Sequence, residues 1–471
     1  MSNEKNGLKK TLGKWDVLAI GFGAIIGWGW LSMGGYWLSA AGSLGSCLAF
    51  AVAGVMIVFV GLAFSELASA MPKAGGVMNY TWRAFGPKVS FFAAWMLTLG
   101  YVAMTAWEGV ATVAAVDFLF PTETGAVLYT IAGQDVYLLS LVIALVAAAI
   151  MFFLAYRGID TIAKFQNASV IIMVVVVLIF AVAAVFKGSA ENLQPTFPNG
   201  FAGSVSIMLM CVLFLGGFDT IPQMAEEMDL PRKTVGKLVI TSILMAILWY
   251  FITLLATAVS LTPDELSGTT LAAGTAMNKI FGGSWAGNIL VISGILGILT
   301  SWVALYIGAT RLLFSMARVG MLPSAFAKLH PKYNTPYVAT IVVGILTFIA
   351  PFFGKKALQW LSNAGGFAIN FGFGFATLAF LVLRFKEPNM ERPYKVPCGK
   401  LVGVLGVIMS FTLVIISLPG VSQFSLVWPN EAGIVIAWVL LGVILFVVSN
   451  RSGRFKQVDE NIRGIVLGDE K

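Results

Sequence analysis

The chain has 471 residues, of which 58% are hydrophobic and only 11% are charged, and its formal net charge is +8. Soluble domains carry about 25% charged residues, so a water-soluble fold of this composition would expose long apolar stretches that such proteins avoid. Strands of membrane barrels alternate apolar and polar residues, whereas the apolar segments here are continuous over about 20 residues, as in membrane-spanning helices. The composition therefore excludes an ordinary soluble protein and predicts helices embedded in a lipid bilayer.

We predict an all-α polytopic membrane protein with twelve transmembrane helices, each formed by one continuous apolar segment. The predicted segments cover residues 16–40, 43–71, 89–118, 136–156, 162–186, 203–225, 235–262, 286–310, 337–353, 357–383, 401–418 and 432–449.

The basic residues fall almost entirely in alternate loops. If the N-terminus is cytoplasmic, all but four of the 30 Lys and Arg residues lie on the cytoplasmic side. The exceptions are Lys187, Lys279, Lys355 and Lys356. The positive-inside rule therefore predicts a multi-pass protein of the cell membrane with both termini in the cytoplasm. The positive charge then sets the topology, and we expect no nucleic-acid partner.

Candidate metal ligands are few. The three cysteines and the single His330 have no metal-type spacing, and one imidazole does not build a metal site. We therefore expect no metal and no cofactor.

Two predicted helices contain clusters of helix-breaking residues. Residues 21–30 of the first read GFGAIIGWGW, and residues 214–222 of the sixth read FLGGFDTIP. Glycine costs about 1 kcal/mol and proline about 3 kcal/mol in a helix interior. These clusters predict discontinuous helices, although glycines also allow helices to pack closely in membranes.

Breaks in corresponding positions, five helices apart, are typical of carriers built from inverted repeats. The predicted organisation is a cytoplasmic tail at 1–14, a first repeat of helices 1–5 at 15–186, a second repeat of helices 6–10 at 201–383, helices 11–12 at 401–449, and a cytoplasmic tail at 450–471.

An unwound helix exposes peptide groups in the middle of the bilayer, where amides bind carboxylates and carbonyls bind cations or ammonium groups. An amino acid presents both charges, so paired breaks suit it as a substrate. The predicted substrate-binding residues are Ile26, Gly27, Trp28, Gly29, Phe214, Gly216, Gly217, Phe218 and Asp219.

Acidic residues inside apolar segments are costly and indicate function. Asp219 is a candidate partner for a substrate ammonium or a coupling proton, or else caps a broken helix. Glu108 is a second cation-partner candidate, or else an interfacial acid beside Trp107. For Glu66, near the predicted cytoplasmic end of helix 2, we expect a structural role. Aromatic rings attract ammonium groups, and the candidate gate or wall residues are Trp107, Trp302 and Tyr306.

No Walker loop, zinc-type His-Glu motif or nucleophile elbow occurs in the sequence, so we do not predict an enzyme. An ion channel would need a pore lined by polar rings, and no filter sequence is repeated here. An amine sensor with the same membrane fold is a further alternative.

Five motifs occur in order along the chain. They are GFGAIIGWG at 21–29, ELASAMPKAGG at 66–76, GFD at 217–219 followed by AEE at 225–227, TRLLFSMAR at 310–318, and RPYKVP at 392–397. Together they resemble motifs of the amino acid–polyamine–organocation superfamily of secondary transporters. The resemblance implies the leucine-transporter-like fold, a five-plus-five inverted repeat with two extra helices. It also implies alternating-access transport of an amino acid, amine or polyamine, by proton symport or by exchange.

Two residues depart from the pattern of that superfamily. Trp28 stands where a small residue is common between the two glycines of the first break. Met173 stands where some members have a lysine in helix 5, and this leaves the proton-coupling mechanism open.

Overall fold

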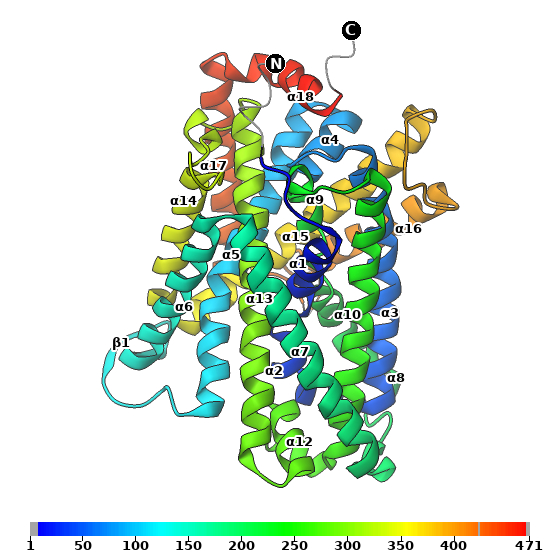
Figure 1. Ribbon diagram of the computed structural model, residues 1–471, viewed down its shortest axis with the longest axis vertical. Helices are drawn as coiled ribbons and strands as arrows, with labels where there is room; N and C mark the ends of the chain where they lie inside the picture. The colour runs from blue at the N-terminus through cyan, green and yellow to red at the C-terminus, as the bar shows by residue number, and fades with distance from the viewer. Residues whose placement is uncertain (1–7, 423, 468–471) are drawn as a thin grey trace.

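The computed structural model describes residues 8–422 and 424–467. Figure 1 shows long helices that run mostly along the longest axis of the molecule. The helices, including short 3-10 helices (η), and the strands are α1 (Lys14–Ile26), α2 (Gly29–Ser32), α3 (Gly34–Ala70), α4 (Val77–Phe85), α5 (Pro87–Leu119), β1 (Val127–Ile131), β2 (Gln134–Tyr137), α6 (Leu138–Arg157), α7 (Ile159–Lys187), η2 (Ala190–Leu193), α8 (Gly200–Phe214), α9 (Thr220–Gln223), η3 (Ala225–Glu227), α10 (Arg232–Ser260), α11 (Pro263–Ser267), α12 (Ala272–Phe281), α13 (Ser284–Arg318), η4 (Ser324–Ala327), α14 (Tyr337–Ile349), η5 (Ala350–Phe353), α15 (Gly354–Lys386), α16 (Gly399–Ile416), α17 (Asn430–Arg451), η6 (Arg454–Gln457) and α18 (Val458–Val466).

The described residues form ten helical stretches that are long and apolar enough to cross a membrane. One of them, Tyr337–Lys386, combines α14, η5 and α15, and the shorter α8 is also apolar. Many side chains on the outer helices are exposed and apolar, including Ile171, Leu248 and Leu440. These features make the chain a multi-pass membrane protein.

The structure corrects one predicted helix boundary and adds short elements to the predicted helices. Most of the described chain is helical, and β1 and β2 add one antiparallel hairpin. The eighth predicted helix does not end at residue 310, because α13 continues to Arg318 and buries Arg311 against Glu227. The tail predicted at 450–471 contains η6 and the amphipathic α18, whose Val458 and Ile462 side chains are buried. The last four residues of that tail lie outside the described range.

The two ends of the helix bundle differ. We call one end the terminal face: it carries α18, at the top of Figure 1, and the segment Leu8–Leu12, which lines the same cavity as α18. The opposite face carries α12 and the β1–β2 hairpin. Lys279 pairs with Glu265, Lys187 donates to the carbonyl of Ile280, and Lys355 pairs with Glu123. These lysines, predicted to be exceptions to the basic-loop pattern, thus lie at the opposite face.

The core places α1 and the α8–α9 region among longer helices. α1 packs against α7, α10 and α13, and α8 packs against α3. α5 packs against both α13 and α15. The two predicted discontinuous segments are therefore enclosed by protein, which lets their unpaired peptide groups avoid contact with lipid.

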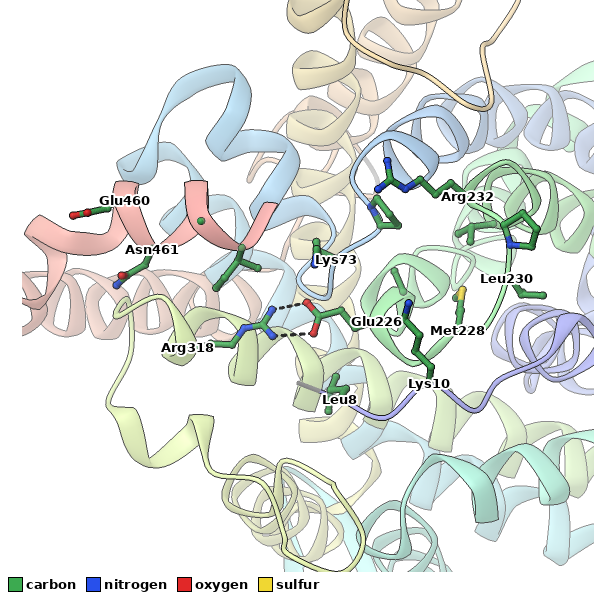
Figure 2. Close-up of a pocket in the computed structure, with 16 residues that line it drawn as sticks. Leu8, Lys10, Lys73, Glu226, Met228, Leu230, Arg232, Arg318, Glu460 and Asn461 are labelled. Carbon is green, nitrogen blue, oxygen red and sulfur yellow. Dashed lines mark hydrogen bonds and ion pairs between the residues drawn. The ribbon is translucent and has the colours of Figure 1, made fainter. Parts of the chain in front are cut away.

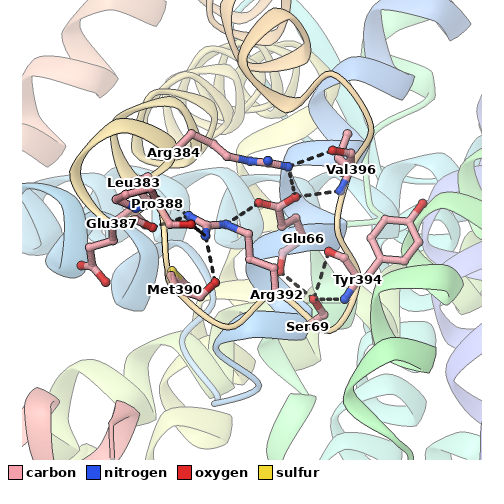
Figure 3. A network of polar contacts seen from close by, with 10 residues as sticks. All are labelled: Glu66, Ser69, Leu383, Arg384, Glu387, Pro388, Met390, Arg392, Tyr394 and Val396. Atoms are coloured by element: carbon pink, nitrogen blue, oxygen red, sulfur yellow. Dashed lines mark hydrogen bonds and ion pairs between the residues drawn. The ribbon is translucent and has the colours of Figure 1, made fainter.

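A buried polar network at the terminal face joins α3 to the segment after α15 (Figure 3). The carboxylate of Glu66 pairs with Arg384, lies 2.8 Å from Nε of Arg392, and accepts a hydrogen bond from the amide of Val396. Arg392 also donates to the carbonyls of Glu387 and Met390. The side chain of Glu66 is 1% exposed and that of Arg392 is 5% exposed. Glu66 therefore has the structural role expected for it.

We predict that Glu66→Ala lowers the free energy of unfolding by about 3–5 kcal/mol, because it leaves two buried guanidinium groups without their carboxylate. The measurement is the thermal unfolding midpoint in detergent. Glu387→Ala is the matched control, since it removes a more exposed pair with Arg83, whose side chains are 19% and 30% exposed, and such pairs contribute about 1 kcal/mol or less. Equal midpoint shifts in the two variants would contradict this role for Glu66.

Candidate functional site

The first break separates α1 from α2. α1 ends at Ile26, Gly27 has φ 13° and ψ −132°, and α2 begins at Gly29. Trp28 is half-buried, and its carbonyl accepts hydrogen bonds from the amides of Leu31 and Ser32. The glycine-rich sequence thus produces a break at the predicted position, because a regular helix cannot contain the backbone angles of Gly27.

The second break lies between α8, which ends at Phe214, and α9, which begins at Thr220. Gly217 has φ 112°, which side chains rarely allow. A Cβ atom at this position would also lie 2.6 Å from the carbonyl oxygen of Ala24 in α1. Gly217 is therefore required for two reasons, namely its backbone conformation and the close approach of α1.

The two breaks touch each other. The Phe214 ring occupies the space that a side chain at Gly29 would need, while the backbone at Gly217 packs on the backbone of Ala24. Phe214 also contacts Trp37 edge to face, with ring centroids 5.3 Å apart. The structure therefore brings together the two glycine clusters, which lie about 190 residues apart in the sequence.

Asp219 lies at the second break and is 1% exposed. The hydroxyl of Tyr101 in α5 donates a 2.5 Å hydrogen bond to its Oδ2. Tyr101 was not identified from the sequence, because a tyrosine in an apolar helix has no distinguishing pattern. The contact fixes the acid of the broken helix against the continuous helix α5.

Glu108 lies further along α5 and is 7% exposed. The hydroxyl of Ser301 in α13 lies 2.6 Å from its Oε1, while its Oε2 is buried without a hydrogen-bond partner among the described residues. A Cβ atom at Gly27 would lie 3.1 Å from Oγ of Ser301. Glu108 is therefore buried beside the first break and is not an interfacial acid.

Met173 of α7 also lies beside the first break. A Cβ atom at Gly297 of α13 would lie 3.2 Å from both the Gly27 carbonyl and the methyl group of Met173. The position at which the resemblance noted above would place a lysine in some members is thus filled by an uncharged thioether.

The aromatic candidates do not all face the breaks. Trp302 is fully buried, with its ring near Gly109 and hence near Glu108. Tyr306 instead donates to the carbonyl of Thr340 in α14, and Trp107 packs with residues of η5 and α15. We therefore keep Trp302 as a wall candidate and place Trp107 and Tyr306 outside the contact between the breaks.

The ring of Phe218, in the second break, is buried among other aromatic side chains. It lies at the centre of an aromatic cluster with Phe64 of α3 and Phe373 of α15, at ring-centroid distances of 5.5 and 5.2 Å. This apolar packing lies directly beside Asp219 in the chain.

Two ion pairs join α13 to η3, just after α9. Arg311 donates to both carboxylate oxygens of Glu227, at 2.8 and 3.0 Å, with side chains that are 1% and 3% exposed. Two turns along the same helix, Arg318 pairs with Glu226 at 2.6 and 2.8 Å. Arg318 and Glu226 line a cavity of about 1400 Å³ at the terminal face (Figure 2). We call this cavity the vestibule and the two ion pairs the double ion pair.

Comparison with known proteins gives one family. Residues 12–448 match the amino acid permease family. The chain belongs to this family. Curated relatives include the branched-chain amino acid permease BcaP of Bacillus subtilis, 30% identical over 96% of this chain and 95% of that protein. The methylthioribose transporter of the same bacterium is 26% identical over 95% of both chains. The vacuolar cationic amino acid transporter 8 of Arabidopsis thaliana is 27% identical over 94% of this chain and 73% of that protein.

The family assigns amino acid transport to this permease and confirms the resemblance inferred from its motifs. Its members are transporters, so the permease is not an enzyme. The channel and sensor alternatives have no support from the relatives.

We predict that Tyr101→Phe lowers stability more than Tyr306→Phe. Tyr101 donates to a carboxylate, a bond that contributes about 1.5–3 kcal/mol, whereas Tyr306 donates to a neutral carbonyl, a bond that contributes about 0.5–1.5 kcal/mol. The thermal unfolding midpoints of the two purified variants measure the difference. A larger loss of stability in the Tyr306 variant would contradict the conclusion that Tyr101 holds Asp219 against α5.

Proposed function

We propose that this permease is a secondary active transporter that carries an amino acid by alternating access, through a site formed where its two broken helices meet. The observation that carries the proposal is the contact of Gly29 with Phe214 and of Gly217 with Ala24. The charged groups of an amino acid lose water when they enter the bilayer interior, and peptide dipoles can replace that water. The two breaks supply such peptide groups at one point of the fold.

The proposed architecture has twelve membrane helices. The stretch Tyr337–Lys386 then counts as two helices, and α8–α9 as one broken helix. Residues 15–186 and 201–383 form the two inverted repeats, each beginning with a discontinuous helix. The terminal face is cytoplasmic in this proposal, which agrees with its basic residues and with the lysines at the opposite face. The protein resides in the cell membrane, with both termini in the cytoplasm.

The proposed binding mode uses peptide groups at both breaks. Amides of Gly27–Gly29 receive the substrate carboxylate, and carbonyls between Phe214 and Asp219 receive the ammonium group. The carbonyl of Phe214 already accepts from Tyr250, and that of Gly217 accepts from Thr220. The carbonyls of Leu215 and Gly216, which lie between them, are therefore our first candidates for the ammonium.

The two membrane acids have different proposed roles. Asp219 is held by Tyr101 and organises the second break. Oε2 of Glu108 has no hydrogen-bond partner among the described residues, and its Oε1 accepts from Ser301, which lies beside Gly27, so Glu108 is the stronger candidate for the coupling proton or for a substrate cation. Burial without a partner is costly for a carboxylate, and this cost favours the uptake of a cation at that oxygen.

The substrate side chain is proposed to be apolar. Large apolar rings surround the breaks: Phe22 and Trp30 each contact Trp249 edge to face, and Phe214 covers Gly29. One curated relative is a branched-chain amino acid permease, which supports the same substrate class. The competing classes are cationic and acidic amino acids, polyamines and methylthioribose.

We predict saturable uptake of labelled leucine, isoleucine or valine into proteoliposomes that contain the purified permease. Unlabelled branched-chain amino acids are expected to compete more strongly than arginine, glutamate, spermidine or methylthioribose, because only the former match an apolar wall. Uptake that rises with an inward proton gradient indicates symport, and uptake that requires internal substrate indicates exchange. Strongest competition by a polyamine would overturn the proposed substrate class.

We predict that Glu108→Gln lowers gradient-driven uptake at least tenfold, because an amide cannot bind a proton. Asp219→Asn is expected to raise the substrate KM by weakening the tie between Tyr101 and the second break. Glu431→Gln is the matched control, since Glu431 is also buried but binds Asn363 and the amide of Val427 at the start of α17. If proton coupling is unchanged in Glu108→Gln, Glu108 does not bind the coupling proton. If substrate affinity and coupling are both unchanged in Asp219→Asn, Asp219 does not organise the second break for substrate binding.

A further inference from the structure

The last described helix, α18, forms one wall of the vestibule (Figure 2). It is amphipathic: Val458 and Ile462 are fully buried, while Glu460 and Arg463 are exposed. Phe455 of the preceding η6 packs on Phe91 of α5 and Phe446 of α17. α18 is therefore docked on the helix bundle by an apolar face.

Two hydrogen bonds tie α18 to different helices. Nδ2 of Asn461 donates to the carbonyl of Val319 at 3.1 Å, and Nε1 of Trp82 in α4 donates to Oδ1 of Asp459 at 2.8 Å. Val319 directly follows Arg318, the arginine of the double ion pair that lines the vestibule. α18 thus connects the end of α13 with α4.

These two attachment points lie on elements that enclose the double ion pair. At the start of α4, Gly76 lies close to Pro222 and Gln223 of α9, while Gly75 lies close to Ser315 of α13. The pairs of Arg311 with Glu227 and of Arg318 with Glu226 hold α13 against η3, so a separation of these two elements would break both pairs. The same separation changes the distance between the end of α13 and α4, and α18 opposes this change because it is bonded to both.

We propose that α18 is a latch that holds the terminal face closed and thereby sets how often the permease opens toward the vestibule. This inference rests on the proposed alternating access, since a latch acts only if the terminal face opens. Each lost hydrogen bond is expected to shift the opening equilibrium by about 2- to 10-fold. Loss of both ties therefore shifts it by roughly tenfold or more toward the open state.

The test measures access to a buried reporter behind the double ion pair. Gln223 of α9 is fully buried, and its side-chain amide has no hydrogen-bond partner among the described residues. Gln223→Cys is therefore introduced after Cys47, Cys211 and Cys398 are replaced by serine. A membrane-impermeant maleimide is applied from the terminal face, and the labelling rate reports how often that face opens.

The latch variant is Asp459→Ala with Asn461→Ala, which removes both ties but keeps good helix formers in α18. Its matched control is Glu460→Ala, at an exposed position of the same helix, and Arg463 is kept in both variants because it pairs with Asp459 at 3.8 Å. We expect labelling of the latch variant to be roughly tenfold faster than that of the control. Equal labelling rates in the two variants would overturn the latch.

The same experiment separates failure of the latch from failure of alternating access. Leucine added to the control variant changes the labelling rate if substrate binding shifts the conformation. If leucine has this effect but the latch variant labels like its control, the latch alone is wrong. If leucine has no effect in any variant, the proposed substrate class is wrong, and the latch is still judged by the comparison of the two variants. If no variant is labelled at all, the proposed opening of the terminal face is wrong, and the latch fails with it.

Discussion

The structure depends on the cost of leaving peptide groups unpaired inside a membrane. Each broken helix frees amides and carbonyls that lipid cannot satisfy, so both breaks must be buried within protein. The permease meets this requirement by packing the breaks on each other, with Phe214 over Gly29 and Gly217 against Ala24. Continuous helices surround them, with α13, α7 and α10 around α1. The site is therefore a direct consequence of how the fold protects its own backbone.

The charged groups follow the same physical rule. Glu227 and Arg311 are buried together, as are Glu66 and Arg392, because an isolated ion in a low-dielectric interior is far more costly than a paired one. Both pairs lie toward the terminal face, where they join segments that are distant in sequence. Glu108 has no cationic partner, and one of its oxygens has no hydrogen-bond partner among the described residues. A buried group that the fold leaves unsatisfied is a natural position for a mobile cation or proton.

Much of the fold could be predicted because lipid imposes simple rules on sequence. Apolar segments such as 89–118 and 162–186 correspond closely to α5 and α7, since only a long helix satisfies such a segment in a bilayer. The predicted gap between residues 40 and 43 falls at Gly42, where α3 has φ 77°. Short elements were missed: α4, α18 and the β1–β2 hairpin are too short to give the signal of a membrane-spanning helix, and α4 and α18 dock on the bundle through buried side chains. Arg311 was placed outside a helix because its charge argued against burial, and only its distant partner explains why α13 continues.

The sequence by itself determined that the chain is helical and embedded in a membrane, and that helices 1 and 6 are interrupted at glycine clusters, because hydropathy and backbone propensity are local properties. It also supplied the motifs of a transporter family. Only the tertiary structure decided which side chains meet: Tyr101 with Asp219, Ser301 with Glu108, and Asn461 with the end of α13. These contacts join residues separated by more than 100 positions, and no local pattern encodes them because each depends on how whole helices pack.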